Sequence, residues 1–279
     1  MEHLKAVFRK LNQLIDQRLP ESEREAISFL VLEHFGYSRS DILKDCMVEI
    51  PADKLDSIIT RLNDHEPVQY ILGEAWFYGR VFKVKKGVLI PRPETELVAE
   101  IILKHYHGDR VIRVLDLGTG SGCIPVTLAA ERPLWEVRAT DISPVALEVA
   151  RFNAEVHQAK VHLMEWDMPA EIPDDIGAID VLVSNPPYIP YSERGTMQPQ
   201  VVDYEPHEAL FAPDSDPIIF YRAVSRWAKK LVVPGGRILV EIQEKYGLPV
   251  KALFEQDGFK EVTIIRDLDN KDRIVQAIK

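Results

Sequence analysis

The sequence predicts an α/β protein in which a small helical domain is followed by a doubly wound, mostly parallel sheet. Three observations support this fold class. Beyond residue 110, apolar β-branched runs alternate with helical patterns. Over residues 1–73, apolar residues recur every three or four positions, as one buried helix face requires. Between these regions, residues 76–90 alternate in polarity and are rich in aromatic and β-branched side chains, which favours a hairpin.

The first 73 residues are expected to form an all-helical domain. Helices are predicted over residues 4–15, 23–36 and 52–67, the second ending at a glycine and the third at a proline. Residues 1–75 contain nine Lys and Arg against fourteen Asp and Glu. Two interpretations are open for this domain: a simple bundle with a solvated acidic face, or a module that docks a substrate protein.

A hairpin linker is predicted for residues 74–91, with Gly79 and Gly87 at its turns. The catalytic domain is then expected to span residues 92–279. It opens with a helix that has Pro93 in its first turn, where proline is tolerated, and acidic residues at its positive end.

Five strands and three further helices are predicted in this domain, followed by a terminal hairpin. The strands are expected over residues 111–118, 136–143, 160–167, 178–185 and 237–242. The helices are expected over residues 123–131, 143–157 and 216–232, the last stopped by Pro-Gly-Gly, and the hairpin over 261–279. Ser143 and Pro144 are typical of an N-cap and a first helical position.

Composition narrows the function classes. No apolar run approaches the ~20 residues of a membrane-spanning helix, and the N-terminus lacks a secretory signal, so a cytoplasmic protein is expected. The formal net charge of −10 argues against a dedicated nucleic-acid binder. Cys46 and Cys123 suit a reducing compartment and are interpreted as packed residues, and no metal site is expected.

A glycine loop with the sequence DLGTGSG follows the first strand of the sheet domain. Gly118, Gly120 and Gly122 permit a tight turn and let the backbone approach a ligand closely. Their G-x-G-x-G spacing differs from the dinucleotide fingerprint and from the lysine-bearing phosphate loop. The loop therefore indicates nucleoside binding, with a glycine turn that only packs helix on strand as the alternative.

Two strand-end carboxylates strengthen the nucleoside interpretation. Asp141 closes the second strand about twenty residues further on, where a carboxylate can accept from both ribose hydroxyls. Asp167 closes the third strand and is placed to accept from an adenine amino group. Because no phosphate-binding lysine is present, a nucleoside without phosphates is favoured, and S-adenosylmethionine fits. The alternative for a single strand-end Asp is a helix cap or a turn.

The fourth strand ends in the sequence SNPPYIP. An amide nitrogen is a poor nucleophile because its lone pair is delocalised, so a site that methylates it must hold both of its hydrogens. Asn185 offers a side-chain oxygen and Pro186 a carbonyl, while Pro187 fixes the backbone and has no competing N–H. Tyr188 is able to stack on a planar amide. These residues predict methyl transfer to a planar nitrogen, with a rigid turn as the alternative.

Four segments together resemble the HemK/PrmC-type glutamine methyltransferases of peptide chain release factors. They are DLGTGSG, SNPPYIP, YEPHEAL (204–210) and the stretch from residue 67 to 96 that contains LIPRPETE. N-P-P-Y is shared with DNA amino methyltransferases, whereas LIPRPETE and YEPHEAL are more specific to this family. The resemblance covers essentially the whole chain.

The resemblance implies a seven-stranded, Rossmann-like class I methyltransferase domain that uses S-adenosylmethionine. The implied substrate is the glutamine of the Gly-Gly-Gln motif in class-1 release factors, and the enzyme is expected to be a monomer. The implied cofactor contacts are Gly118, Thr119, Gly120, Ser121, Gly122, Asp141, Ile142, Asp167, Met168 and Asn185. The implied substrate contacts are Asn185, Pro186, Pro187 and Tyr188, with Arg92, Pro93, Glu94 and Thr95 at the mouth of the site.

The chain departs from the family pattern in two places: Met168 replaces a large aromatic residue or Leu, and FAPDSDPII at 211–219 replaces a glycine-rich stretch. Three other functions remain open. A ribosomal-protein glutamine methyltransferase keeps the chemistry, and a nucleic-acid amino methyltransferase requires a basic insertion that the sequence does not contain. A nucleoside-binding scaffold would have no use for paired acceptors beside the glycine loop.

Overall fold

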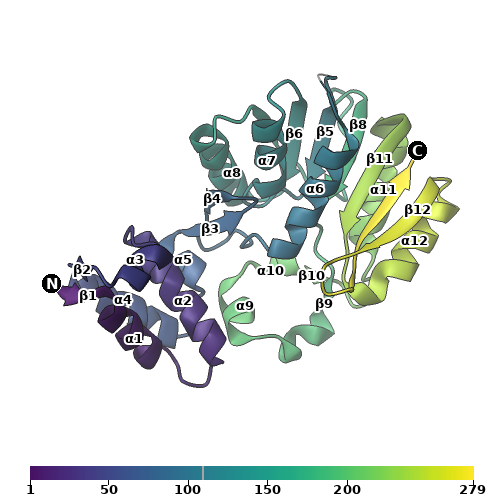
Figure 1. Cartoon of the computed structure of the whole chain (residues 1–279). Coiled ribbons are helices and arrows are strands. Elements are labelled where there is room, and N and C mark those ends of the chain that lie inside the picture. Colours follow the sequence, from purple (N-terminus) through teal and green to yellow (C-terminus); the bar gives the residue numbers. More distant parts are fainter. Residues whose placement is uncertain (109) are drawn as a thin grey trace. The chain divides into compact units, whose positions relative to one another are not determined.

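The helices predicted near the N-terminus form in the computed structural model, which describes residues 1–108 and 110–279 (Figure 1). The chain divides into two units. The first consists of Met1–Glu74 with Gln198–Tyr204, and the second of Ala75–Met197 with Glu205–Lys279. The segment 198–204 therefore belongs with the N-terminal residues although it is far from them in sequence.

The first unit is built from helices around one apolar core. They are α1 (Leu4–Leu14), α2 (Glu21–His34), α3 (Arg39–Lys44), α4 (Ala52–Asn63) and α5 (Val68–Leu72). The unit also contains α9 (Pro199–Tyr204), which has no buried residue. Leu4, Val7 and Leu11 of α1 are buried at the spacing that predicted the helix. The Tyr204 hydroxyl of α9 donates to the Asp64 carbonyl at 2.7 Å. The helical N-terminal domain is thus confirmed.

Short elements of this unit escaped prediction. Helices α3 and α5 are only six and five residues long, so neither covers two turns of apolar periodicity. A capping box between Ser38 and Asp41 starts α3. A two-residue antiparallel ladder joins β1 (Glu2–His3) to β2 (Met47–Val48), in a region expected to contain helices alone.

The hairpin forms over β3 (Glu74–Phe77) and β4 (Arg80–Lys83), a shorter span than the predicted linker. Tyr78 and Gly79 turn between the strands with φ of 49° and 71°, as a two-residue hairpin turn requires. Asn153 anchors the hairpin. Its Oδ1 accepts from Lys83 N at 2.7 Å, and its Nδ2 donates to the carbonyls of Lys83 and Ser121 at 3.0 and 2.8 Å.

Within the described residues of the second unit, seven strands form one sheet in the order β12-β13-β11-β8-β5-β6-β7. Their bounds are β5 (Arg113–Leu117), β6 (Glu136–Asp141), β7 (Val161–Glu165), β8 (Ile179–Ser184), β11 (Val232–Glu241), β12 (Lys260–Arg266) and β13 (Asp272–Ile278). Strands β11, β8, β5, β6 and β7 run parallel, and β13 runs antiparallel to both of its neighbours, β11 and β12. The predicted doubly wound fold and its terminal hairpin are confirmed.

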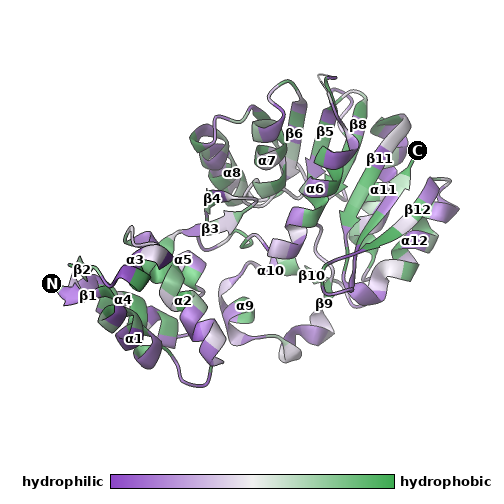
Figure 2. Cartoon of the chain, viewed as in Figure 1, coloured by the Kyte–Doolittle hydropathy of each residue, from purple (hydrophilic) through white to green (hydrophobic). Residues whose placement is uncertain are grey.

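Helices cover both faces of this sheet. They are α6 (Glu96–His105), α7 (Cys123–Glu131), α8 (Pro144–Val156), α11 (Ile219–Leu231) and α12 (Gly247–Gln256). Alternate residues of β5 serve the two faces: Leu115 and Leu117 join the core with Trp227 of α11, and Val114 joins the core with α6 and α7. Figure 2 shows the central strands as hydrophobic, as expected for a sheet buried on both sides.

The order of the strands indicates where a ligand would bind. Strands β5, β6 and β7 follow one another outward in one direction, and β8 and β11 lie on the other side of β5. The winding therefore reverses between β5 and β8, and ligands of open α/β sheets bind at the carboxyl ends of strands at such a point. The glycine loop leaves β5 and the Asn-Pro-Pro-Tyr segment leaves β8.

Two details of the sheet differ from the prediction. Strand β11 begins directly after α11, and Pro234 to Gly236 lie inside it as an irregularity between Val232 and Arg237. A Cβ on Gly236 would lie 2.5 Å from a Val232 methyl, so the bulge requires glycine there. Asp167 lies two residues beyond the end of β7, because pairing with β6 stops at Glu165.

The remaining elements are short connections in the second unit. They are η1 (Pro93–Thr95), η2 (Tyr191–Thr196), η3 (Glu244–Tyr246), α10 (His207–Leu210), β9 (Ile189–Pro190) and β10 (Phe211–Ala212). Strand β10 pairs in parallel with β9, so the FAPDSDPII stretch begins against the chain that follows Tyr188. None of the helices in the described ranges is long and apolar enough to cross a membrane.

Candidate active site

The glycine loop is shaped by backbone conformations that favour glycine. Gly118, Gly120 and Gly122 have φ of +73°, +55° and +79°, in the left-handed region where a Cβ is strained. The amides of Gly118 and Thr119 both donate to the Thr140 carbonyl at 2.9 Å. These bonds fold the loop back onto β6. A Cβ on Gly122 would meet Ala150 at 3.0 Å, so this glycine serves the packing of α7 on α8.

Asp141, the last residue of β6, holds the loop through its carboxylate. One oxygen accepts from Gly120 N at 2.8 Å and the other from Ser143 N at 2.9 Å. Burial raises the pKa of Asp141 above its ordinary value. Ser143 in turn caps α8, since its Oγ accepts from Ala146 N at 3.3 Å. The carboxylate is therefore fixed in orientation at the edge of the pocket.

In the loop and at the end of β5 lie buried polar atoms that make no hydrogen bond of normal geometry within the described part of the chain. They are both carboxylate oxygens of Asp116, Thr119 Oγ1 and Ser121 Oγ. Burial raises the pKa of Asp116 to about 7, and the nearby charge of Asp141 adds to the rise. Buried polar groups are nearly always paired, so these atoms are consistent with a ligand that brings polar or cationic groups.

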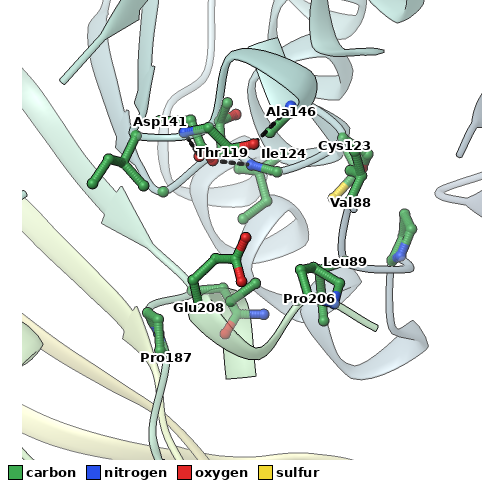
Figure 3. A pocket seen from close by; sticks show the side chains of 18 of the residues that line it. Val88, Leu89, Thr119, Cys123, Ile124, Asp141, Ala146, Pro187, Pro206 and Glu208 are labelled. Atoms are coloured by element: carbon green, nitrogen blue, oxygen red, sulfur yellow. Dashed lines mark hydrogen bonds between the residues drawn. The ribbon is translucent and has the colours of Figure 1, made fainter. Parts of the chain in front are cut away.

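The pocket beside the loop is enclosed by segments from both sides of the switch point. It is lined by residues 87–92, 118–121, 123–124, 141–143 and 166–168, together with Thr95, Ala146, Asn185, Pro187, Phe220 and residues of the 206–209 segment. Figure 3 shows Glu208 and Pro206 facing Asp141 and Thr119 across the cavity, with Val88 and Leu89 beside them. Among the described residues no ion pair involves Asp141 or Glu208, so the acidic lining favours a cationic ligand.

The far wall is formed after β7. The Met168 carbonyl accepts from the indole Nε1 of Trp227 at 2.9 Å, and the Met168 methyl lies 3.6 Å from the position of a Cβ on Gly118. Met168 therefore covers the glycine loop from the side. Cys123 also lines the pocket, but burial raises its pKa to about 12, so it is a neutral thiol.

The Asn-Pro-Pro-Tyr segment is fixed by side chains from distant parts of the sequence. Strand β8 ends at Ser184, whose hydroxyl donates to the Leu117 carbonyl of β5 at 2.7 Å. Asn185 Nδ2 donates to Thr95 Oγ1 at 3.2 Å, and Thr95 Oγ1 donates to Glu241 Oε2 at 2.6 Å. The Tyr188 hydroxyl donates to the other oxygen of Glu241 at 3.3 Å.

An ion pair fixes the segment before α6. Arg92 Nη2 donates to Glu205 Oε1 at 2.5 Å, and Ile90 N donates to Glu205 Oε2 at 3.3 Å. The Glu205 side chain is buried, whereas the Arg92 side chain is one-third exposed. LIPRPETE and YEPHEAL, the two segments most specific to the family, therefore meet through this ion pair.

Most of the residues predicted from the sequence come together in one pocket. Those that line it are Arg92, Thr95, Gly118, Thr119, Gly120, Ser121, Asp141, Ile142, Asp167, Met168, Asn185 and Pro187. Those that do not line it are Pro93, Glu94, Gly122, Pro186 and Tyr188. Pro93 and Glu94 are exposed, Pro186 is buried, and Tyr188 directs its hydroxyl toward Glu241.

Several residues of the site were missed by the sequence interpretation. Glu241 and Glu205 are buried carboxylates that organise predicted residues, and Asp116 lies under the loop. Glu241 sits in an apolar strand and Glu205 in a motif quoted only for its resemblance, so neither showed a chemical pattern of its own. A charged residue in a strand that is otherwise buried was the available signal for Glu241.

Comparison with known proteins first defines the class. Residues 92–202 match the "Methyltransferase small domain" family and residues 6–73 match the "PrmC N-terminal domain" family. A methyltransferase from Pyrococcus furiosus shares the fold with a TM-score of 0.53 and 21% identity, over 73% of this chain and 90% of that one. The second unit has the fold of a methyltransferase.

Curated relatives then identify the family. The release factor glutamine methyltransferase of Bacteroides thetaiotaomicron is 39% identical over 271 residues, which cover 96% of this chain and 97% of that protein. The enzyme of the same description from Cereibacter sphaeroides is 40% identical over 84% of this chain and 82% of its own length. The chain belongs to the PrmC/HemK family of release factor glutamine methyltransferases, as the motifs predicted.

Proposed function

We propose that this chain transfers a methyl group from S-adenosylmethionine to the side-chain amide nitrogen of the glutamine in the Gly-Gly-Gln motif of class-1 peptide chain release factors. The observation that carries the proposal is the placement of Asn185 in the same pocket as the glycine loop. The relatives named for this activity match over nearly the whole chain, which supports the same substrate class.

The cofactor is assigned to the β5–β6 side of the pocket. Gly118 to Gly122 would lie against it, Asp141 and Ile142 would bind its ribose, and Asp167 and Met168 its adenine. When bound, S-adenosylmethionine supplies an electrophilic methyl group on a sulfonium. The acidic lining formed by Asp141 and Glu208, without a paired cation among the described residues, fits a cationic nucleoside and disfavours a phosphorylated one.

The substrate carboxamide is assigned to the β8 side. The Asn185 side-chain oxygen and the Pro186 carbonyl would each accept one hydrogen of the glutamine Nε2, which holds the amide plane still and leaves its nitrogen facing the cofactor. Burial raises the pKa of Tyr188, so its hydroxyl keeps its proton and donates to Glu241. Its ring does not line the pocket and would stack on the amide only after turning toward it. The methylated nitrogen releases its proton to solvent, and no histidine base is assigned.

The segment before α6 is assigned to the mouth of the pocket. Arg92 and Thr95 line it, whereas Pro93 and Glu94 are exposed and would contact the release factor itself. The N-terminal helical domain is proposed to dock that protein. We expect the enzyme to act in the cytoplasm, because the proposed substrate belongs to the translation machinery.

The deciding experiment offers separate substrates to the full-length protein with S-adenosylmethionine labelled in its methyl group. The substrates are purified class-1 release factors, the same factors with the motif glutamine replaced by asparagine, ribosomal proteins, and DNA. We expect label in the intact release factor alone, with mass spectrometry placing one methyl group on the motif glutamine. Labelling of a ribosomal protein or DNA in place of the release factor would overturn the proposal.

A further inference from the structure

A buried network links the Asn-Pro-Pro-Tyr segment to the end of β11. It consists of Asn185, Thr95, Glu241 and Tyr188, and we call it the Glu241 network. Glu241 is 1% exposed and its two carboxylate oxygens accept from different hydroxyls, those of Thr95 and Tyr188. The Tyr221 hydroxyl donates to the Glu241 backbone carbonyl at 3.0 Å. The carboxylate is therefore held in place from several directions.

The hydrogen bonds of this network have a defined direction. An ionised carboxylate only accepts, so the single hydroxyl hydrogen of Thr95 is donated to Glu241. The Thr95 oxygen is then left as an acceptor, and the group of Asn185 that can donate to it is the amide nitrogen. The two ends of an asparagine amide are distinguished by their partners. Thr95 therefore binds Nδ2 and leaves Oδ1 to face the other way.

The charge of Glu241 is influenced by groups on several elements. Burial raises its pKa, and the charge of Glu94 adds to the rise, while Arg273 on β13 and the hydroxyls of Thr95 and Tyr188 act in the opposite direction. The Tyr188 hydroxyl stays protonated and acts as a donor. The ionised form is the one whose two oxygens can accept at once from the hydroxyls of Thr95 and Tyr188.

From this geometry we infer that Glu241 is a positioning residue that sets, through Thr95, which end of the Asn185 amide faces the substrate. The inference rests on the proposed function for its kinetic consequence. With the oxygen outward, Asn185 accepts from the glutamine N–H₂ group. With the amide reversed, two N–H₂ groups face each other and the substrate nitrogen loses its acceptor. Glu241 itself does not line the pocket.

Variants of the network test the kinetic consequence. Thr95→Val removes the hydroxyl and keeps the shape, Thr95→Ser keeps the hydroxyl, and Glu241→Gln replaces one of the two accepting oxygens with an NH₂ donor. We expect Thr95→Val and Glu241→Gln each to lower kcat about 10- to 100-fold, the effect of leaving a buried polar group mispaired. KM for the release factor and Kd for the cofactor should stay within about threefold, and Thr95→Ser should restore most of kcat.

The double variant Glu241→Gln/Thr95→Val separates one network from two independent effects. If Glu241 acts through Thr95, the double variant loses no more activity than either single variant. Multiplying losses, or a wild-type kcat in Thr95→Val, would overturn the inference. Thr263→Val and Glu261→Gln, at exposed positions of the edge strand β12, are matched controls and should behave as wild type.

A substrate-independent measurement tests the geometry alone. In the full-length protein labelled with ¹⁵N-asparagine, the Asn185 side-chain amide signal is assigned by its loss in Asn185→Asp. We expect nuclear Overhauser contacts from its NH₂ protons to the Thr95 methyl group in the wild type. The absence of these contacts would overturn the inference whatever the substrate is. If the contacts are present but the release factor is not methylated in the experiment above, only the proposed substrate is contradicted.

Discussion

On the β5–β6 side of the pocket the backbone places the atoms that face a ligand, whereas on the β8–β11 side distant side chains do so. The glycine loop is folded by two amide bonds to Thr140 and by the Asp141 carboxylate, all within about twenty-five residues of sequence. Asn185 is held by Thr95 and Glu241, which lie 90 and 56 positions away. The first side is a local structure and the second depends on the whole fold.

This difference suggests that the two sides have separate roles, substrate positioning on the β8 side and cofactor binding on the β5–β6 side, and experiments can test the separation. Damage on the β8 side should reduce turnover and spare cofactor affinity. Damage on the β5–β6 side should do the opposite. Four substitutions or titrations test this, from the largest expected effect to the smallest.

Asn185→Ala should have the largest effect. Removing the side-chain acceptor deprives the substrate amide of the group that orients it, so kcat should fall about 1,000-fold, within the range known for groups that orient a reacting centre. Cofactor Kd, measured by calorimetry, should change less than about threefold. Equal losses in kcat and cofactor affinity would show that Asn185 binds the cofactor as well as the substrate, which would contradict separate roles for the two sides of the pocket.

Asp141→Ala should raise the cofactor Kd about 10- to 100-fold, because it removes a charged acceptor that also holds the Gly120 amide. At saturating cofactor, kcat should remain within a few-fold of wild type. Calorimetric titration gives the first quantity and single-turnover methylation the second. An unchanged Kd would reject Asp141 as a cofactor residue.

Cofactor affinity should depend on pH through Asp116, whose pKa burial raises to about 7. A protonated carboxyl is neutral and does not attract a cation, whereas its ionised form does. Affinity should therefore increase as pH rises from 5.5 to 7.5, by at most about tenfold per pH unit below the pKa. Titrations in two buffers of different ionisation enthalpy measure the proton released.

The control for this titration is Asp116→Asn, which cannot ionise and should bind with an affinity independent of pH over the same range. A wild-type affinity that stays level or decreases as pH rises would show that Asp116 does not sense the cofactor.

Ser143→Ala should have the smallest effect. It removes the side-chain cap of α8, which costs about 1 kcal/mol. Tm should fall by about 2–4 °C in a domain of this size, as calorimetry would measure, with kcat at saturating cofactor unchanged. Ser215→Ala, in an exposed loop, is the matched control. A loss of kcat would mean that the start of α8 affects the methyl-transfer step, and the roles of the two sides would then not be separate.

The same division explains how much the sequence could predict. The glycine loop, Asp141 and the ends of α7 and α8 follow from local rules of spacing, capping and strand pattern, and the structure contains them at the expected positions. Asn185 was found because two prolines beside a strand end are unusual. Its partners Thr95 and Glu241 are joined to it only by folding, so no local rule could connect them.

The limits of the fold prediction have a similar cause. Periodicity identifies helices that are long enough to show two turns, so α1, α2 and α4 were predicted and α3 and α5 were missed. Pro234 to Gly236 have the composition of a turn, yet they lie inside β11 because the residues on either side of them, Val232 and Arg237, both pair with β8. Tertiary contacts in this case override local preference.

The chain passes between its two units three times, at residues 74–75, 197–198 and 204–205. A single cut after residue 74 would therefore leave α9 attached to the wrong fragment and would strip the helical half of the residue that bonds to Asp64. Deletion of the first 74 residues would thus remove most of the helical half and would leave α9 in the remaining fragment without the residue to which it bonds. Fragments that restore the lost piece, such as a permuted chain or a peptide of residues 198–204 added back, are needed to learn what the helical half contributes.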